Sequence, residues 1–271
     1  MNNKDYCATL DQVEHIALEA GRRILDVYDQ EFDVSDKEDG SPLTEADNAA
    51  NKIIVKELNA LTPDVPVLTE ESEFVPYEKR KDWNEFWLVD PLDGTKEFIK
   101  RNGEFTVNIA LIAGGKPVLG VVYVPVTGVC YKACAGKGAC RLDGKSGKVE
   151  LKVRTFGGER PIVVASRSHA SEALQGYLSR LGEHDIVSMG SSLKFCLVAQ
   201  GSADIYPRLG PTSEWDIAAA HCIVEAAGGK ITDTKGQALQ YNKPDLLNPK
   251  FLVSGAGDYD WLQYLDPSDS D

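Results

Sequence analysis

The chain has 271 residues, of which 42% are hydrophobic and 26% charged, and its formal net charge at pH 7 is −13. This composition is typical of a globular enzyme with a core of its own. The negative charge argues against a nucleic-acid polymer as partner, because proteins that bind such polymers carry basic patches. It is compatible with a phosphate substrate only where divalent cations reverse the local charge of acidic side chains.

Membrane and redox signals are weak. No apolar run approaches the roughly 20 residues that a membrane-spanning helix needs. The first residues do not show a basic stretch followed by an apolar one, so we expect a cytoplasmic protein without an integral membrane segment. The cysteines form no C-x-x-C pair and are interpreted as reduced thiols. They are Cys7, Cys130, Cys134, Cys140, Cys196 and Cys222.

The N-terminal part is predicted to consist mainly of helices. Apolar residues at helical spacing predict an amphipathic helix over residues 10–29 and a second over 44–61, with a polar loop over 33–43 between them. A short strand is predicted over 65–68. The charged stretch 73–84 is predicted to be a mobile loop.

The middle of the chain has the pattern of an antiparallel sheet. Residues 86–89 predict a buried strand that ends at the turn 90–95. Strands are predicted over 106–112 and 117–124, and Gly114-Gly115 between them is typical of a hairpin. Further short strands are expected up to about residue 154.

From about residue 160 the pattern changes to alternating strands and helices. Strands are predicted over 162–165, 186–188 and 203–206, and helices over 171–181, 192–200 and 215–227. We therefore predict a layered α/β architecture that forms one catalytic unit. Its subdomains would be roughly 1–155, with the helices and the antiparallel sheet, and 156–271, with the α/β units.

An acidic turn follows the most apolar predicted strand. Asp90 and Asp93 are three residues apart in a turn stiffened by Pro91 and opened by Gly94. Ligand sites of α/β proteins lie at strand ends. Two carboxylates and the Leu92 carbonyl form the set of oxygen ligands that Mg²⁺ prefers. Because acids beside so apolar a strand are costly to bury without a cation, we interpret this turn as a metal site.

Other acids allow both functional and structural interpretations. Glu70-Glu71 also follows a strand, although by itself it is typical of a solvated turn. Asp216 begins a predicted helix whose amides would face an anion. Asp216 lies three residues after Ser213, and Asp47 three after Thr44, so each also fits the spacing of a capping box.

Two competing phosphate motifs are disfavoured. Phosphatases with an aspartyl nucleophile carry D-x-D-G-T after a strand, and this chain has one more residue between its acids. Gly144-Lys145-Ser146 is similar to the end of a P-loop, but Gly138 is one residue out of place. No strand-to-helix context surrounds it, so we interpret it as a hairpin turn.

Three segments together resemble the inositol monophosphatase superfamily, in the order that family shows. They are Glu70-Glu71-Ser72, Trp87-Leu88-Val89-Asp90-Pro91-Leu92-Asp93-Gly94-Thr95, and Trp215-Asp216-Ile217-Ala218-Ala219-Ala220 with Gly228-Gly229. Within the superfamily, three further segments resemble the bacterial 3′(2′),5′-bisphosphate nucleotidases. These are Asp93-Gly94-Thr95-Lys96-Glu97-Phe98, Ser166-Arg167-Ser168-His169 and Gly190-Ser191-Ser192-Leu193-Lys194-Phe195.

The resemblance implies a fold and an activity. The fold would be the αβαβα sandwich of the inositol monophosphatase and fructose-1,6-bisphosphatase type. The activity would be hydrolysis of the 3′-phosphate of adenosine 3′,5′-bisphosphate by metal-activated water, giving AMP and phosphate, in sulfur metabolism. The resemblance further implies two or three Mg²⁺ ions and inhibition by Li⁺. It leaves open the 5′-phosphosulfate analogue as a substrate, and a peripheral association with the cytoplasmic face of the inner membrane.

The resemblance also implies residue roles. The metal ligands would be Glu70, Asp90, the Leu92 carbonyl, Asp93 and Asp216. Asp47 and Thr95 would orient and deprotonate the attacking water, aided by Glu71. The amides of Gly94 and Thr95 would contact the scissile phosphate. The groups around the nucleotide would be Ser166, His169, Ser192, Lys194 and Arg208.

Two other functions remain open from the sequence. An inositol-1-phosphate phosphatase could use the same metal motif, but it would leave the cationic groups at 166–169 and Lys194 without a second phosphate. A non-catalytic, metal-dependent nucleotide-binding protein is the alternative of another class. Such a protein would not need Asp47 and Thr95.

Overall fold

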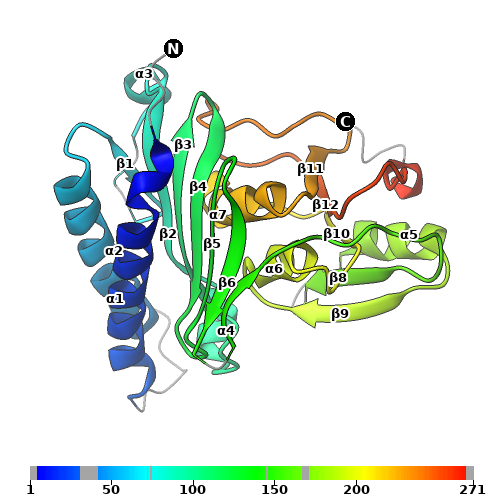
Figure 1. Ribbon diagram of the computed structural model, residues 1–271, viewed down its shortest axis with the longest axis horizontal. Helices are drawn as coiled ribbons and strands as arrows, with labels where there is room; N and C mark the ends of the chain where they lie inside the picture. Colours follow the sequence, from blue (N-terminus) through cyan, green and yellow to red (C-terminus); the bar gives the residue numbers. More distant parts are fainter. Residues whose placement is uncertain are drawn as a thin grey trace.

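The fold is a stack of five alternating layers of helices and sheets (Figure 1). The first layer holds α1 (Leu10–Tyr28) and α2 (Pro42–Leu61), and the second is a seven-stranded sheet. The third holds α6 (Leu193–Ala199) and α7 (Glu214–Ala226). A five-stranded sheet follows, covered by α5 (Glu172–Leu181). This computed structural model describes residues 5–30, 42–71, 73, 75–144, 146–166 and 171–266.

The first sheet has its strands in sequence order. They are β1 (Val67–Thr69), β2 (Glu85–Asp93), β3 (Thr106–Ala113), β4 (Lys116–Val124), β5 (Val129–Cys134), β6 (Gly138–Asp143) and β7 (Gly147–Glu150). Only the β1–β2 pair is parallel. The predicted hairpin at Gly114-Gly115 is confirmed. The strands that flank the second predicted hairpin turn also pair, with Asp143 opposite Gly147, while Lys145 of that turn lies outside the described residues.

The second sheet has the order β11-β12-β10-β8-β9 and mixes parallel and antiparallel pairs. Its strands are β8 (Ile162–Ser166), β9 (Asp185–Met189), β10 (Ile205–Arg208), β11 (Lys230–Asp233) and β12 (Phe251–Ser254). The strand β10 runs parallel to β8 and antiparallel to β12. The carboxyl ends of β8 and β10 therefore lie at the same edge, which faces the cavity described below.

Both faces of the first sheet are buried, which explains the continuous apolar run of β2. Phe86 and Leu88 belong to the core between the two sheets, and Trp87 and Val89 to the core beneath α1 and α2. This alternation is the period of two of a β-strand. On the inner face α7 packs so closely that a side chain at Gly120 would meet the carbonyl of Ala219.

Two expectations about polar segments are wrong. Residues 75–84 are not a loose loop, because they contain the short helix α3 (Tyr77–Arg80) and the side chain of Arg80 is fully buried. The helix that was predicted from Thr44 begins at Pro42, so Asp47 lies inside it and not at a capping position. The capping box of Ser213 and Asp216 is confirmed.

The expectation of reduced thiols is wrong for one pair of cysteines. Cys7 and Cys134 form a disulfide that joins the short helix η1 (Tyr6–Thr9) to the end of β5. The two residues are 127 positions apart, so no sequence spacing could indicate their pairing. The remaining four cysteines are free and buried. In the described part of the chain, no helix combines the length and the apolar character that crossing a bilayer requires.

Candidate active site

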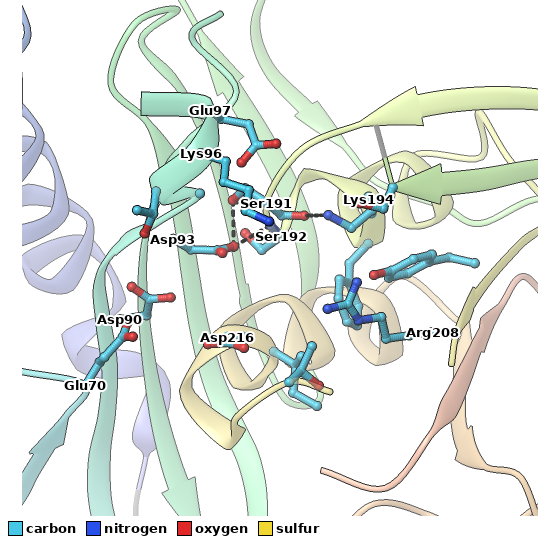
Figure 2. Close-up of a pocket in the computed structure, with 17 residues that line it drawn as sticks. Glu70, Asp90, Asp93, Lys96, Glu97, Ser191, Ser192, Lys194, Arg208 and Asp216 are labelled. Atoms are coloured by element: carbon cyan, nitrogen blue, oxygen red, sulfur yellow. Dashed lines mark hydrogen bonds between the residues drawn. The ribbon is translucent and has the colours of Figure 1, made fainter. Parts of the chain in front are cut away.

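A cavity of about 340 Å³ opens between the two sheets, and its two ends differ in charge (Figure 2). Acidic side chains from β1, β2 and α7 form one end. Basic side chains from α6 and β10 form the other. The sequence pattern placed these groups at strand ends and helix starts, and the layer arrangement brings them into one space.

The acidic end is formed by three carboxylates from three segments. Glu70 follows β1, Asp90 lies in β2, and Asp216 is in the first turn of α7. Because β1 and β2 are parallel, Glu70 and Asp90 emerge at the same sheet edge. One oxygen from each of the three carboxylates lies within 4.8 Å of the others. Three acids this close together form a set of hard oxygen ligands for a divalent cation.

The electrostatics of these acids favour a cation. Burial, together with the charges of Asp93 and Glu70, raises the pKa of Asp90 well above its usual value. Burial and the charge of Asp93 raise the pKa of Asp216 to about 7, and the same two causes raise the pKa of Glu70. None of the three carboxylates forms an ion pair with a described lysine or arginine. A divalent cation would relieve this repulsion, so the residues fit a metal site.

Asp93 points toward α6 and away from the three clustered carboxylates. Its Oδ2 accepts hydrogen bonds from the Ser191 hydroxyl and the Ser192 amide, each at 2.6 Å (Figure 2). Asp93 lines the cavity, but one of its oxygens is therefore occupied. The amide of Leu92 donates to Asp90 Oδ1 at 3.0 Å, which stabilises the turn. Metal ligation by Asp93 and by the Leu92 carbonyl stays a prediction.

The predicted water-activating pair lies beside the acidic end. Asp47 is partly buried in α2, and its Oδ1 has no hydrogen-bond partner among the described residues. Burial and the charges of Glu71 and Glu70 raise the pKa of Asp47 to about 8. Thr95 lines the cavity at the start of α4 (Thr95–Ile99), after Gly94 in a left-handed conformation with φ 104°. Asp47 and Thr95 are not hydrogen-bonded to each other, so a proton relay between them stays a prediction.

The basic end contains two cationic groups, of which Lys194 is buried and Arg208 is half-buried. The Lys194 ammonium donates to the Ser191 carbonyl at 2.6 Å and lies 5.7 Å from the centre of the Tyr206 ring. Burial lowers the pKa of Lys194 to about 8. Arg208 donates to the Pro211 carbonyl, and its buried Nε has no hydrogen-bond partner in the described structure. A buried ammonium beside a guanidinium with an unsatisfied Nε favours an anionic ligand.

The other predicted nucleotide contacts differ in accessibility. Ser166 ends β8 and lines the cavity. Ser192 also lines the cavity, but it is almost fully buried and its hydroxyl is hydrogen-bonded to Thr106 and Asn108 of the first sheet, each at 2.9 Å. A direct contact between Ser192 and a substrate stays a prediction. His169 lies outside the described residues.

The sequence patterns did not single out several residues of this site. Ser191 has a left-handed backbone with φ 52° and bonds to both Asp93 and Thr106 through its hydroxyl. Tyr206 and Thr212 line the basic end. Ser191 was part of a quoted motif, but no pattern indicates its backbone conformation. Tyr206 has the composition of an ordinary strand residue, so no signal distinguished it.

The sequence model of the inositol monophosphatase family matches residues 8–263. The chain belongs to this family. A curated family member from Escherichia coli K12, named 3′(2′),5′-bisphosphate nucleotidase CysQ, is 53% identical over 90% of this chain and 99% of its own length. Its namesake from Haemophilus influenzae is 38% identical over 93% of this chain and 94% of its own length.

Solved structures agree with the family assignment. CysQ from Bacteroides thetaiotaomicron is 42% identical, with a TM-score of 0.85 over 94% of this chain and 99% of that structure. Inositol monophosphatase II from Staphylococcus aureus is 24% identical with a TM-score of 0.80, covering 97% of both chains, and this likeness shows the fold alone. The predicted layered fold of the inositol monophosphatase family is confirmed.

Proposed function

We propose that this protein is a magnesium-dependent 3′(2′),5′-bisphosphate nucleotidase. It would remove the 3′-phosphate of adenosine 3′,5′-bisphosphate to give AMP and phosphate. One observation carries the proposal: a single cavity joins a cluster of three carboxylates to two cationic side chains, the buried Lys194 and the half-buried Arg208. A bisphosphate has one anionic group for each end. The curated relatives that carry this activity in their names support the same substrate.

The acidic end would hold Mg²⁺ through Glu70, Asp90 and Asp216, with Asp93 and the Leu92 carbonyl as further ligands. Bound Mg²⁺ neutralises charge on a phosphate and makes a water molecule easier to deprotonate. In that cavity the amides of Gly94 and Thr95 would bind the phosphate that is hydrolysed. Positioning and electrostatics supply most of the catalysis in reactions of this class.

Asp47 is suited to accept the proton of the attacking water. Its Oδ1 is buried and has no hydrogen-bond partner among the described residues, and burial raises the pKa of Asp47, which makes its carboxylate a stronger base than an exposed one. Thr95 would orient the water from the start of α4. Glu71 acts at a distance, because its charge helps to raise the pKa of Asp47.

The basic end distinguishes this substrate from inositol 1-phosphate. The second phosphate of a nucleotide would pair with Lys194 and Arg208, while Ser166 and His169 complete the nucleotide side. An inositol monophosphate has no group that could satisfy these cations, and an unpaired buried cation is costly. The basic end therefore favours a bisphosphate.

We further propose that the chain acts as one catalytic unit. The largest core cluster contains Phe86 from the first sheet and Phe251 from the second, so the two halves share a core. Inhibition by Li⁺ and action in the cytoplasm belong to the same proposal and rest on the family resemblance.

The test compares phosphate release from adenosine 3′,5′-bisphosphate, inositol 1-phosphate and fructose 1,6-bisphosphate, each with Mg²⁺ and with EDTA. We expect the adenosine compound to be hydrolysed much faster than the others, and EDTA to stop the reaction. Preference for inositol 1-phosphate would contradict the role of the basic end. A rate that EDTA leaves unchanged would contradict the metal site.

A further inference from the structure

A polar network with two fully buried charged side chains lies at the start of α7, outside the residues that line the cavity. Its centre is Asn242, which lies in the segment between β11 and β12. The backbone of Asn242 is left-handed, with φ 66°. Asparagine tolerates this conformation better than most residues. The segment, orange in Figure 1, reaches the β3–β4 turn, where the Tyr241 amide donates to the Gly115 carbonyl at 3.2 Å.

On one side Asn242 bonds to the segment that follows Glu70. The fully buried guanidinium of Arg80 donates to Asn242 Oδ1 at 2.8 Å and to the Pro244 carbonyl at 2.9 Å. The Asn242 side-chain amide donates back to the Arg80 carbonyl at 2.7 Å. These reciprocal hydrogen bonds attach α3 to residues 242–244.

On the other side Asn242 bonds to the start of α7. Glu214 is the first residue of that helix and is fully buried. Its Oε2 accepts a hydrogen bond from the backbone amide of Asn242 at 2.7 Å. Its Oε1 accepts hydrogen bonds from the backbone amide of Lys243 at 3.1 Å and from the Lys243 ammonium. Asp216 lies two residues later, in the same helical turn. Glu214 therefore anchors the turn that carries Asp216.

One asparagine thus connects the buried Arg80 to the turn that brings Asp216 to the cavity. Asp90 is held by β2, which pairs on both sides, and the Glu70 amide continues this pairing by donating to the Val89 carbonyl at 3.1 Å. Asp216 lies at a helix end, so no sheet fixes its position. Burying Arg80 and Glu214 is costly, and packed apolar side chains could stabilise the fold equally well.

We propose that Arg80, Asn242 and Glu214 are positioning residues for the divalent-cation site. They would fix the position of the Asp216 carboxylate relative to Glu70 and Asp90, so that the cation meets its ligands without rearrangement. The inference rests on the proposed metal-dependent function. Hydrogen-bonded partners that orient metal ligands typically contribute 10–100-fold to metal affinity, by the general behaviour of metal sites.

The test measures Mn²⁺ binding to the full chain by electron paramagnetic resonance, well below the unfolding temperature of each variant. Asn242→Gly removes the side-chain bonds to Arg80 and keeps a residue that accepts the positive φ. We expect its dissociation constant for Mn²⁺ to rise about tenfold. We expect kcat at saturating Mg²⁺ to be largely kept, because the chemistry of the loaded site is unchanged.

Asp204→Asn is the matched control. Asp204 is also a buried carboxylate, which accepts from the Ile162 amide at 2.8 Å and pairs with Arg154 at 2.9 Å, but it does not line the cavity. This variant should lose stability and keep the wild-type affinity for Mn²⁺. If Asn242→Gly does not fold, Glu214→Gln replaces it with the same expected result, because it keeps the shape of the side chain and removes its charge.

The outcomes separate the inference from the proposed function. Weaker Mn²⁺ binding by Asn242→Gly alone supports the inference. Equal affinity in Asn242→Gly and the wild type, or equal weakening in the control, would overturn it while the metal site stands. Absence of Mn²⁺ binding by the wild type would overturn the metal site, and this inference with it.

Discussion

The two ends of the cavity are opposite in charge and alike in being electrostatically incomplete. At the acidic end, burial and mutual repulsion raise the pKa values of Glu70, Asp90 and Asp216. At the basic end, burial lowers the pKa of Lys194. In each case the fold holds like charges in a place that disfavours them. Binding of a counter-ion therefore stabilises each end. The counter-ion is a cation at the acidic end and an anion at the basic end.

The two ends also differ in the parts of the chain that supply them. The first half supplies Glu70 and Asp90 to the acidic end, and the second half supplies Asp216 to that end as well as both cations of the basic end, Lys194 and Arg208. Asp93 connects the halves, because it ends β2 and accepts hydrogen bonds from Ser191 and Ser192 at the start of α6. Changes at the acidic end should therefore affect metal binding and turnover. Changes at the basic end should affect the choice of substrate.

Asp90→Asn should give the largest effect. Loss of this carboxylate removes several kcal/mol of charge stabilisation by a bound metal ion, which corresponds to a fall in kcat/KM of about 10³-fold. The metal-free variant should be more stable than the wild type at pH 7. Because the pKa of Asp90 is raised in the folded state, the folded protein loses stability as the pH rises from the ordinary pKa of an aspartate, 3.8, toward the raised one, and asparagine avoids this cost.

The measurements for Asp90→Asn are phosphate release with Mg²⁺ and thermal unfolding in EDTA. A thermal midpoint equal to or above that of the wild type, together with the lost activity, would show that the fold is intact. Near-normal turnover would contradict the metal assignment of Asp90.

Lys194→Met should change selectivity more than turnover. Hydrogen bonds to charged groups contribute about 1.5–3 kcal/mol, so kcat/KM for adenosine 3′,5′-bisphosphate should fall about 10–100-fold. Adenosine 3′-monophosphate has no 5′-phosphate, so kcat/KM for this substrate should fall little. The check is the ratio of the two kcat/KM values in the wild type and in the variant. An equal loss for both substrates would contradict a role of Lys194 in recognising the second phosphate.

Loss of the Lys194 charge at high pH should lower kcat/KM by less than its replacement with methionine does. The pKa of Lys194 is lowered to about 8, so its charged form is present below that pH and is lost as the pH rises through it. The kcat/KM for the bisphosphate should therefore decline a few-fold above pH 8, over the range in which one group titrates. Lys194→Arg keeps its charge at these pH values and should remove the decline. A decline that persists in Lys194→Arg would assign it to another group.

Sequence patterns could predict the acidic end because its signals are local. The run from Phe86 to Val89 is apolar at every position since both faces of the sheet are covered, and Asp90 interrupts it abruptly. The capping box at Ser213 and Asp216 is equally local. In the structure Asp216 caps α7 and also lies within the carboxylate cluster, so the structural interpretation does not exclude the predicted role as a metal ligand.

Features that depend on distant segments could not be predicted in this way. Arg80 lies in a charged stretch that resembles a solvated loop, yet its side chain is buried against Asn242, which accepts its hydrogen bond. Asn242 is 162 positions away in the chain, so no local pattern indicates this burial. The strand β11 has only four residues of mixed polarity, and its pairing partner β12 begins at Phe251. The orientation of Asp93 toward Ser191 likewise depends on how the two halves pack.

Replacement of the Cys7–Cys134 disulfide should leave the difference between the two ends unchanged. Neither cysteine lines the cavity, so kcat/KM of Cys7→Ser should equal that of the wild type. The disulfide closes a loop of more than one hundred residues, and such cross-links stabilise proteins by about 2–4 kcal/mol. The thermal midpoint should fall by several degrees, and treatment of the wild type with a dithiol should reproduce the fall. Lower activity of the fully folded variant would contradict this prediction. It would mean that the disulfide between η1 and β5 influences the cavity through the first sheet.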